Sequence, residues 1–143
     1  TPTGPQGELL RRHGDQMERL PGGWYRSHGR SDDTMNLKGI KVSSAEIERA
    51  IGGVRGIRET AAVAVPPAAG GPDELVIYVV LQPGVVADPK HLRRELGVAL
   101  RTHHSSLFKI HDVVLVDALP RTPSNKVMRR LLRARYRPAS RPP

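Results

Sequence analysis

The sequence predicts an α+β fold, in which a small β-hairpin is followed by a three-stranded sheet with helices packed on one face of it. Three short apolar runs, at residues 60–65, 75–81 and 112–116, have the length and composition of strands. Segments with helical periodicity lie between and after these runs. Prolines and glycines gather at the chain ends and in the connections, so the middle is expected to fold as one unit.

Turn signals and strand composition define the first elements. Residues 7–12 and 23–27 are expected to form short strands, and Gly39 fits the tight turn of a polar hairpin. The run at 60–65 is stopped by two prolines, and the run at 75–81 is apolar throughout. A continuous apolar run of this length is typical of a central, buried strand.

The first two helices begin with recognisable caps. Ser43 followed by Glu46 forms a capping box, and Asp88 followed by Pro89 places an N-cap residue before a proline at the first helical position. The apolar face of the first helix comprises Ile47, Ala50, Ile51 and Val54. That of the second comprises Leu92, Leu96, Ala99 and Leu100. A turn-rich loop at 120–125 leads to a final helix expected at 127–136.

Composition limits the functional classes. The chain has 143 residues and no cysteine, which excludes disulfides and thiolate metal sites. No apolar stretch approaches the roughly 20 residues of a membrane span, and the N-terminus lacks a signal-peptide pattern. We therefore expect a soluble, cytoplasmic protein. His103 and His104 have no further ligand at metal-binding spacing, so no metal site is expected.

The net charge of +9 favours contact with polyanions such as nucleic acid, acidic membranes or phosphate-rich cofactors. The C-terminal basic residues are Lys126, Arg129, Arg130, Arg133, Arg135, Arg137 and Arg141. A solvated helix face and tail would explain most of them. A small nucleic-acid-binding module is the alternative, but one Trp, three Tyr and one Phe leave little for base stacking.

Three sequence blocks resemble the acyl-activating superfamily of acyl-CoA synthetases, adenylation domains and luciferases, and they occur in that family's order. Residues 11–15, Arg-Arg-His-Gly-Asp, resemble the Tyr-x-Thr-Gly-Asp motif, with His13 in place of Thr. The resemblance implies that Asp15 accepts hydrogen bonds from the ribose hydroxyls of ATP and AMP. A carboxylate suits this role because it is an acceptor only.

The second block, residues 29–42, is similar to the family's Gly-Arg-x-Asp-Asp motif and especially to a subgroup of plant acyl-activating enzymes. Asp15 and Arg30 are fifteen positions apart, as in acetyl-CoA synthetases. The resemblance places Arg30 near the nucleotide. It makes Asp32 the hinge about which a C-terminal domain turns.

The same block and a later arginine imply contacts with CoA and phosphate. By resemblance, Lys38 and Gly39 lie near the pantetheine of CoA, and Lys41 stands where acetyl-CoA synthetases carry a phosphate-contacting Arg. Lysine keeps the charge of that Arg and loses its bidentate fork. Arg101 lies twenty-five positions before Lys126, as does a family arginine that contacts the nucleotide part of CoA. A surface residue of the second helix is the equally weighted alternative for Arg101.

The third block, residues 120–130, resembles the family's Pro-Lys-Thr-x-Ser-Gly-Lys-Ile-Met-Arg-Arg. The catalytic lysine of that motif corresponds to Lys126. Asn125 replaces the family's glycine, and Asn is the least unfavourable substitute if the loop needs a positive φ at this position.

The resemblance as a whole implies the C-terminal portion of an AMP-forming acyl-CoA synthetase, a ligase that makes acyl-AMP from a carboxylic acid and ATP and transfers the acyl group to CoA. Residues 1–31 would end a large N-terminal adenylation domain, 32–137 would form the mobile C-terminal domain, and 138–143 would be a disordered tail. The portion alone is expected to be inactive. Mg²⁺ would act in the full-length enzyme, held by residues not identifiable in this sequence.

Two other interpretations stay open. An adenylation domain that loads a carrier protein would share the motifs, although residues 35–44 favour the CoA ligases. A free-standing interaction domain is the other. The N-terminal domain of the same chain and a small carboxylic acid are the expected partners.

Overall fold

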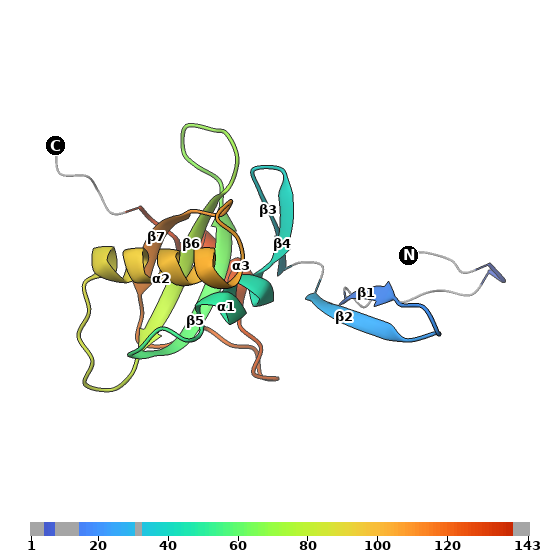
Figure 1. Cartoon of the computed structure of the whole chain (residues 1–143), viewed down its shortest axis with the longest axis horizontal. Helices are drawn as coiled ribbons and strands as arrows, with labels where there is room; N and C mark the ends of the chain where they lie inside the picture. Colours follow the sequence, from blue (N-terminus) through green and yellow to red (C-terminus); the bar gives the residue numbers. More distant parts are fainter. Residues whose placement is uncertain (1–4, 8–14, 31–32, 139–143) are drawn as a thin grey trace.

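The described part of the chain contains two β-hairpins followed by a three-stranded sheet with helices. The computed structural model describes residues 5–7, 15–30 and 33–138, without the side chains of 15, 16 and 27–30. The elements are β1 (Asp15–Arg19), β2 (Tyr25–Arg30), β3 (Thr34–Leu37), β4 (Ile40–Ser43), α1 (Ser44–Ile51), β5 (Ile57–Val65), β6 (Glu74–Leu81), α2 (Pro89–His103), β7 (Ile110–Leu115) and α3 (Arg129–Arg135). Figure 1 shows the β1–β2 hairpin to one side of a body formed by the other elements.

The two hairpins are antiparallel and differ in their turns. In the first, the Leu20 N–H donates to the Trp24 carbonyl at 2.8 Å. In the second, Lys38 and Gly39 form the turn with φ values of 53° and 82°. Two successive positive φ values match the twist of a two-residue hairpin, which confirms the predicted turn at Gly39.

The strand predictions for the first 30 residues are only partly met. β2 overlaps the predicted strand at 23–27 and extends beyond it, whereas β1 was not predicted. Of the other predicted strand, 7–12, all but Gly7 lie outside the described residues. The tail predicted at 138–143 likewise lies outside them, except for Pro138.

Both predicted helix caps are confirmed. The Glu46 N–H donates to the Ser43 hydroxyl at 3.1 Å, and the Ser43 N–H donates to the Glu46 carboxylate at 3.3 Å. The Asp88 carboxylate accepts from the His91 N–H at 3.1 Å, with Pro89 at the start of α2. These bonds satisfy backbone donors that a helix leaves unpaired at its N-terminus.

The sheet has the strand order β5-β6-β7, with β6 antiparallel to β5 and parallel to β7. The parallel pair is connected through α2, as a parallel connection requires. The predicted central position of the second apolar run is confirmed, because six consecutive residues of β6 are buried. The three predicted runs were displaced by up to three residues at their ends from the observed strands.

The expectation that all helices cover one face of the sheet is wrong. α1 and α2 pack with Ala62, Ala64, Leu75, Ile77 and Val79 in one apolar cluster. α3 packs through Leu132 on the opposite face, in a second cluster with Ala61, Val63, Val76 and Tyr78. Alternate residues of a strand point to opposite faces, so continuously apolar strands require cover on both. The α+β class itself is confirmed.

The last helix begins later than the sequence predicts. α3 starts at Arg129, not at Val127, because Val127 forms an antiparallel bridge with Arg121. The Met128 N–H donates to the Pro120 carbonyl at 2.8 Å. Both residues are therefore bonded across the preceding loop and close it, and neither belongs to the helix.

Candidate functional site

Lys126 lies in a closed loop, residues 120–128, which we call the lysine loop. Thr122 organises its interior: its N–H donates to the Lys126 carbonyl at 2.8 Å, and its carbonyl accepts from the Asn125 N–H at 2.8 Å. The Thr122 hydroxyl oxygen accepts from the Lys126 N–H at 3.1 Å and lies 3.0 Å from the Ser124 hydroxyl. The backbone on both sides of Lys126 is thus fixed by one residue.

Asn125 adopts a left-handed backbone, with φ of 67°. The loop therefore needs a positive φ at the position where Asn125 replaces the family's glycine. Asparagine tolerates this region better than other side-chain-bearing residues, so the turn forms without glycine.

Arg121 ties the lysine loop to the sheet. Its guanidinium pairs with Glu59 of β5 and donates to the Asn125 carbonyl at 3.0 Å. One planar group thus connects a strand to the peptide that precedes Lys126. A guanidinium suits this because its N–H groups point in several fixed directions.

The Lys126 side chain itself is exposed. Among the described residues, no carboxylate forms an ion pair with its ammonium group. The backbone of Lys126 is fixed and its ammonium group is exposed to solvent. The ammonium group can therefore pair with a negatively charged ligand.

The β3–β4 hairpin presents a second set of predicted site residues. Its buried residues Met35 and Val42 anchor it to the body, whereas Lys38, Gly39 and Lys41 are exposed. Lys38 borders a cavity of about 500 Å³. Charged or titratable groups on the cavity wall are Lys38, Arg93, Lys109, His111, Asp73 and Glu74. The His111 Nε2 lies 3.0 Å from the Glu74 carboxylate, and Lys38, Arg93 and Lys109 are the lysine and arginine side chains of the wall.

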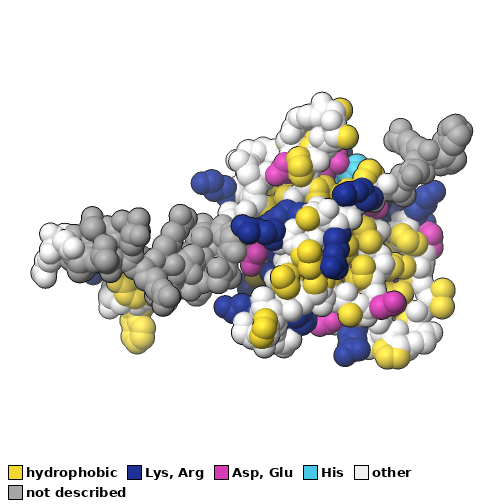
Figure 2. All heavy atoms as spheres, turned by 180° about the vertical axis from the view of Figure 1, so that it is seen from behind, with side chains coloured by type: hydrophobic (Ala, Val, Ile, Leu, Met, Phe, Trp, Pro, Cys, Tyr) yellow, Lys and Arg dark blue, Asp and Glu magenta, His cyan; other side chains and the backbone are white. Residues whose placement is uncertain are grey.

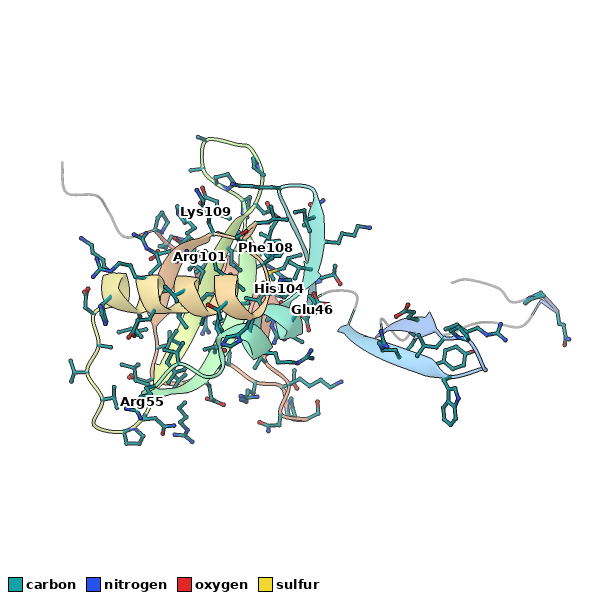
Figure 3. The ribbon with its side chains drawn as sticks, viewed as in Figure 1. Glu46, Arg55, Arg101, His104, Phe108 and Lys109 are labelled. Carbon is teal, nitrogen blue, oxygen red and sulfur yellow. The ribbon has the colours of Figure 1, made fainter. Side chains whose placement is uncertain are left out.

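Arg101 is exposed in the last turn of α2. Figure 3 labels it together with Lys109, which precedes β7. Neither Arg101 nor Lys126 is among the described residues that line the cavity beside Lys38. His104 lies 3.8 Å from the Glu46 carboxylate and edge-on to Phe108, so it closes the end of α2 against α1.

The lysine loop and the β3–β4 hairpin lie on opposite faces of the sheet. Met35 and Val42 of the hairpin belong to the apolar cluster that contains α1 and α2. Leu119, directly before the lysine loop, and Val127, within it, pack in the cluster on the other face. The β3–β4 hairpin and the lysine loop are therefore anchored in apolar clusters on opposite faces of the sheet.

For the remaining predicted residues, Asp15, Arg30 and Asp32, the structure describes no side chain. The β1–β2 register pairs Asp15 with Arg30, but their side chains are not among those described. Asp32, the predicted hinge, lies outside the described residues. The first described residue after it is Asp33, whose carbonyl accepts from the Ser44 hydroxyl at 3.0 Å.

Two tyrosines that sequence analysis did not single out hold α3. Tyr136 donates to the Asp112 carboxylate at 2.8 Å, and Tyr78 donates to the Leu132 carbonyl at 2.9 Å. Burial, followed by the hydrogen bond to Asp112, raises the pKa of Tyr136 far above its ordinary value. Burial, followed by the Asp112 charge, also raises the pKa of Tyr78. No local pattern could have revealed these contacts, because the partners are far apart in sequence.

On the face seen in Figure 2, the charged side chains of the described residues are not gathered in one stripe. Figure 2 shows lysine and arginine side chains among hydrophobic and acidic ones on the visible face of the body. Nowhere in the part of the chain that the structure describes do three or more His, Asp or Glu side chains come together as metal ligands. Of the described helices, none combines the length and apolar character needed to cross a bilayer.

Comparison with known proteins identifies relatives over most of the chain. The profile of the AMP-binding enzyme C-terminal domain family matches residues 46–126. "Probable acyl-activating enzyme 17, peroxisomal" of Arabidopsis thaliana is 50% identical over 90% of this chain, and "Hexanoyl-CoA synthase" of Cannabis sativa is 47% identical over 91%. "Acetyl-coenzyme A synthetase" of Deinococcus radiodurans is 39% identical over 84%. In each case the chain spans 18% of the relative's length.

Solved structures share the fold. ATP-bound MatB from Rhodopseudomonas palustris has a TM-score of 0.72 and 26% identity over 92% of this chain and 25% of its own. A Mycobacterium tuberculosis fatty acyl CoA synthetase has a TM-score of 0.64 and 28% identity, over 87% of this chain and 24% of its own.

Proposed function

The chain belongs to the AMP-binding enzyme C-terminal domain family, and from this premise we propose that it is the mobile part of an ATP-dependent, AMP-forming acyl-CoA ligase. The parent enzyme would activate a carboxylic acid as acyl-AMP and then transfer the acyl group to CoA. Residues 32–137 would form the mobile domain, and residues 1–31 would end the large N-terminal domain, which is the partner.

The observation that carries this proposal is the placement of the two candidate groups on opposite faces of one sheet. The lysine loop is anchored in the apolar cluster on the face covered by α3, and the Lys38–Gly39 turn belongs to a hairpin anchored on the face covered by α1 and α2. A domain with one reactive group on each face can serve one active site with either face in turn. Rotation about a hinge would exchange the faces between the two half-reactions.

In the first half-reaction, Lys126 would stabilise charge on the α-phosphate and the attacking carboxylate. Two anionic groups must approach each other there, and negative charge develops on the phosphoryl oxygens and on the leaving pyrophosphate as the carboxylate–phosphorus bond forms and the α–β phosphoanhydride bond breaks. A cation fixed at that point therefore lowers the barrier. The bonds from Thr122 and Arg121 to the loop backbone would hold the stem of the lysine in place. Asp15 would hold the ribose hydroxyls, with Arg30 and Lys41 near the phosphates.

In the second half-reaction, the opposite face would guide CoA. Gly39 has no side chain to obstruct a narrow pantetheine arm, and apart from its chain neighbours no described atom lies within 4 Å of a Cβ placed there. The cavity beside Lys38 offers about 500 Å³ with Arg93 and Lys109 on its wall. Arg101 would add a cation for the nucleotide part of CoA. Mg²⁺ enters the proposal only as the companion of the ATP phosphates, and no residue assigned here holds it.

Asp32 would be the hinge, because it precedes the first element of the body and follows the β1–β2 hairpin. A hinge needs a position where a change in φ and ψ moves one module as a unit. Asp33 supports this location, since its carbonyl is already fixed to Ser44 at the start of α1.

The test compares the parent enzyme with this chain alone. The parent should exchange pyrophosphate into ATP when given carboxylic acids and should release acyl-CoA, identified by mass spectrometry, when CoA is added. The isolated chain should do neither, because it contains no phosphate loop and no wall for an acyl chain. Exchange by the isolated chain at a rate near that of the parent would contradict the proposal.

The same assay addresses the acceptor. The relatives "Hexanoyl-CoA synthase" and "Acetyl-coenzyme A synthetase" are CoA enzymes by name, which favours CoA. Formation of acyl-AMP that is discharged only by a phosphopantetheinylated carrier protein would favour an adenylation domain instead. Nucleic-acid binding has weaker support, because Arg129 of the basic C-terminal helix is already paired with carboxylates.

The location of the parent protein is a separate proposal. The sequence led us to expect the cytoplasm, whereas the name of the Arabidopsis relative specifies the peroxisome. A fluorescent fusion of the complete parent protein, imaged with a peroxisomal marker, distinguishes the two.

A further inference from the structure

Arg129 joins three parts of the chain that lie far apart in sequence. Its guanidinium forms a bidentate pair with Glu48 of α1, at 2.7 and 2.8 Å, and an Nε bond to the same carboxylate at 3.1 Å. The remaining nitrogen, Nη1, donates to the Asp33 carboxylate at 3.1 Å. The side chain is only 13% exposed, so both ion pairs are partly shielded from water. Charge-assisted bonds of this kind are strong and directional.

Glu48 extends the connection to the sheet. Its Oε1 also accepts from the Ala62 N–H of β5 at 2.9 Å. The Glu48 carboxylate therefore fixes α1, β5 and the start of α3 to one another. Glu48 also neutralises the charge of Arg129 by itself, so Asp33 is not needed for that.

The Asp33 carboxylate is the one member of this network that can be removed without breaking a contact between α1, β5 and α3. It stands directly after the proposed hinge, Asp32, and ninety-six residues before Arg129. Its backbone remains tied to Ser44 whatever its side chain. Loss of the Asp33 carboxylate would thus leave the Glu48–Arg129 pair and the body intact, and would free only the link between the hinge end and α3.

Arg129 is also linked to Lys126 through the backbone. It opens α3 immediately after Met128, whose N–H is bonded to Pro120 at the other end of the lysine loop. The loop is a closed unit, because Arg121 and Val127 form a bridge across it. A shift of Arg129 would therefore shift the whole loop, including the stem of Lys126.

We infer that the Asp33–Arg129 ion pair is a positioning device, which fixes the orientation of the lysine loop relative to the hinge. This inference rests on the proposed function and adds a role for two residues to it. When the domain rotates about the hinge, the lysine loop moves with it as a rigid body. Lys126 therefore has a single orientation in the adenylation state. Without the pair, the loop would arrive over a range of orientations.

The test uses the parent enzyme and measures its two half-reactions separately. Asp33→Ala should lower kcat for pyrophosphate exchange about tenfold, because small misplacement of a reacting group has effects of this size or larger. KM for ATP and the conversion of supplied acyl-AMP to acyl-CoA should each change by less than about twofold, since the opposite face serves the second step. Asp33→Asn keeps an oxygen acceptor for Nη1 and should recover most of the lost rate.

Matched variants separate positioning from stability. Arg129→Lys keeps the charge and loses the fork, and it should reproduce the selective loss of exchange. Arg130→Lys, at the exposed neighbouring position, and Asp117→Asn, an exposed carboxylate, should behave as the wild type. If Arg129→Lys does not fold, the Asp33 variants decide the matter, because they leave the Glu48 pair in place.

Two results would overturn the inference. One is unchanged exchange in Asp33→Ala, and the other is an equal fall in both half-reactions, which indicates general damage. These differ from failure of the proposed function itself, which would appear as normal exchange in Lys126→Ala.

Discussion

Thr122 and Lys126 are joined twice: the Thr122 N–H donates to the Lys126 carbonyl at 2.8 Å, and the Lys126 N–H donates to the Thr122 hydroxyl at 3.1 Å. The second bond depends on a side chain, whereas the first depends only on the backbone. The hydroxyl can therefore be removed while the loop keeps its main closure. This separation makes the contribution of loop rigidity measurable.

Thr122→Val in the parent enzyme should lower the rate of pyrophosphate exchange about fivefold to tenfold, because an unmade hydrogen bond of this kind is worth on the order of 1 kcal/mol. Valine has nearly the shape of threonine, so packing is conserved. Thr122→Ser restores the hydroxyl and should restore the rate. A valine variant with full exchange activity would show that the hydroxyl does not position Lys126.

Lys126→Ala should reduce pyrophosphate exchange by at least about a hundredfold, a loss typical when a group that stabilises transition-state charge is removed. Conversion of supplied acyl-AMP to acyl-CoA should continue at close to the normal rate, since this step does not need the lysine. Lys90→Ala, an exposed lysine on α2, is the control for lost charge. Equal impairment of both half-reactions in Lys126→Ala would contradict the catalytic role.

Asp32→Pro should give the opposite result. Proline fixes φ near −65° and so restricts rotation at this residue without touching the chemistry. We expect exchange to persist and thioester formation to fall about tenfold or more, as for a blocked conformational step. Asp32→Ala leaves φ free and serves as the control. Survival of both half-reactions in the proline variant would remove Asp32 from the hinge.

The raised pKa of Tyr136 predicts that the free energy of unfolding depends on pH. Its folded-state pKa is raised above the ordinary value of 10.0, mainly by burial and then by the Asp112 bond. Its contribution is therefore fully present below that value and is lost as the pH rises above it, because the unfolded chain releases the proton more readily. Urea unfolding should show stability falling more steeply above about pH 10 in the wild type than in Tyr136→Phe.

The control for this titration is Tyr25→Phe. Tyr25 is 61% exposed, so its loss should leave the pH profile of the free energy of unfolding unchanged. Tyr136→Phe should also lower stability near neutral pH by about 1 kcal/mol, from the lost bond to Asp112. Parallel wild-type and Tyr136→Phe profiles at high pH would show that the pKa of Tyr136 is not raised in the folded protein.

Local signals in the sequence were sufficient for most individual elements. The capping box at Ser43 and Glu46 and the cap at Asp88 depend on residues three positions apart, so the chain specifies them without knowledge of the fold. The glycine turn after Lys38 and the buried central strand follow from similarly local patterns. The late start of α3 was missed, because the extended backbone at Val127 is imposed by Arg121 across the loop.

By itself, the sequence determined the α+β class, the helix caps and the motif spacing that gives Lys126 and the Lys38–Gly39 turn their proposed roles. Only the tertiary structure decided that the segments carrying these two groups are anchored on opposite faces of the sheet, and that Arg129 pairs with Glu48 and Asp33. The physical reason is distance along the chain. Caps and turns are set by bonds within a few residues. By contrast, the hydrogen bond that holds α3 on the sheet joins residues 54 positions apart, and the ion pairs of Arg129 join residues 81 and 96 positions apart.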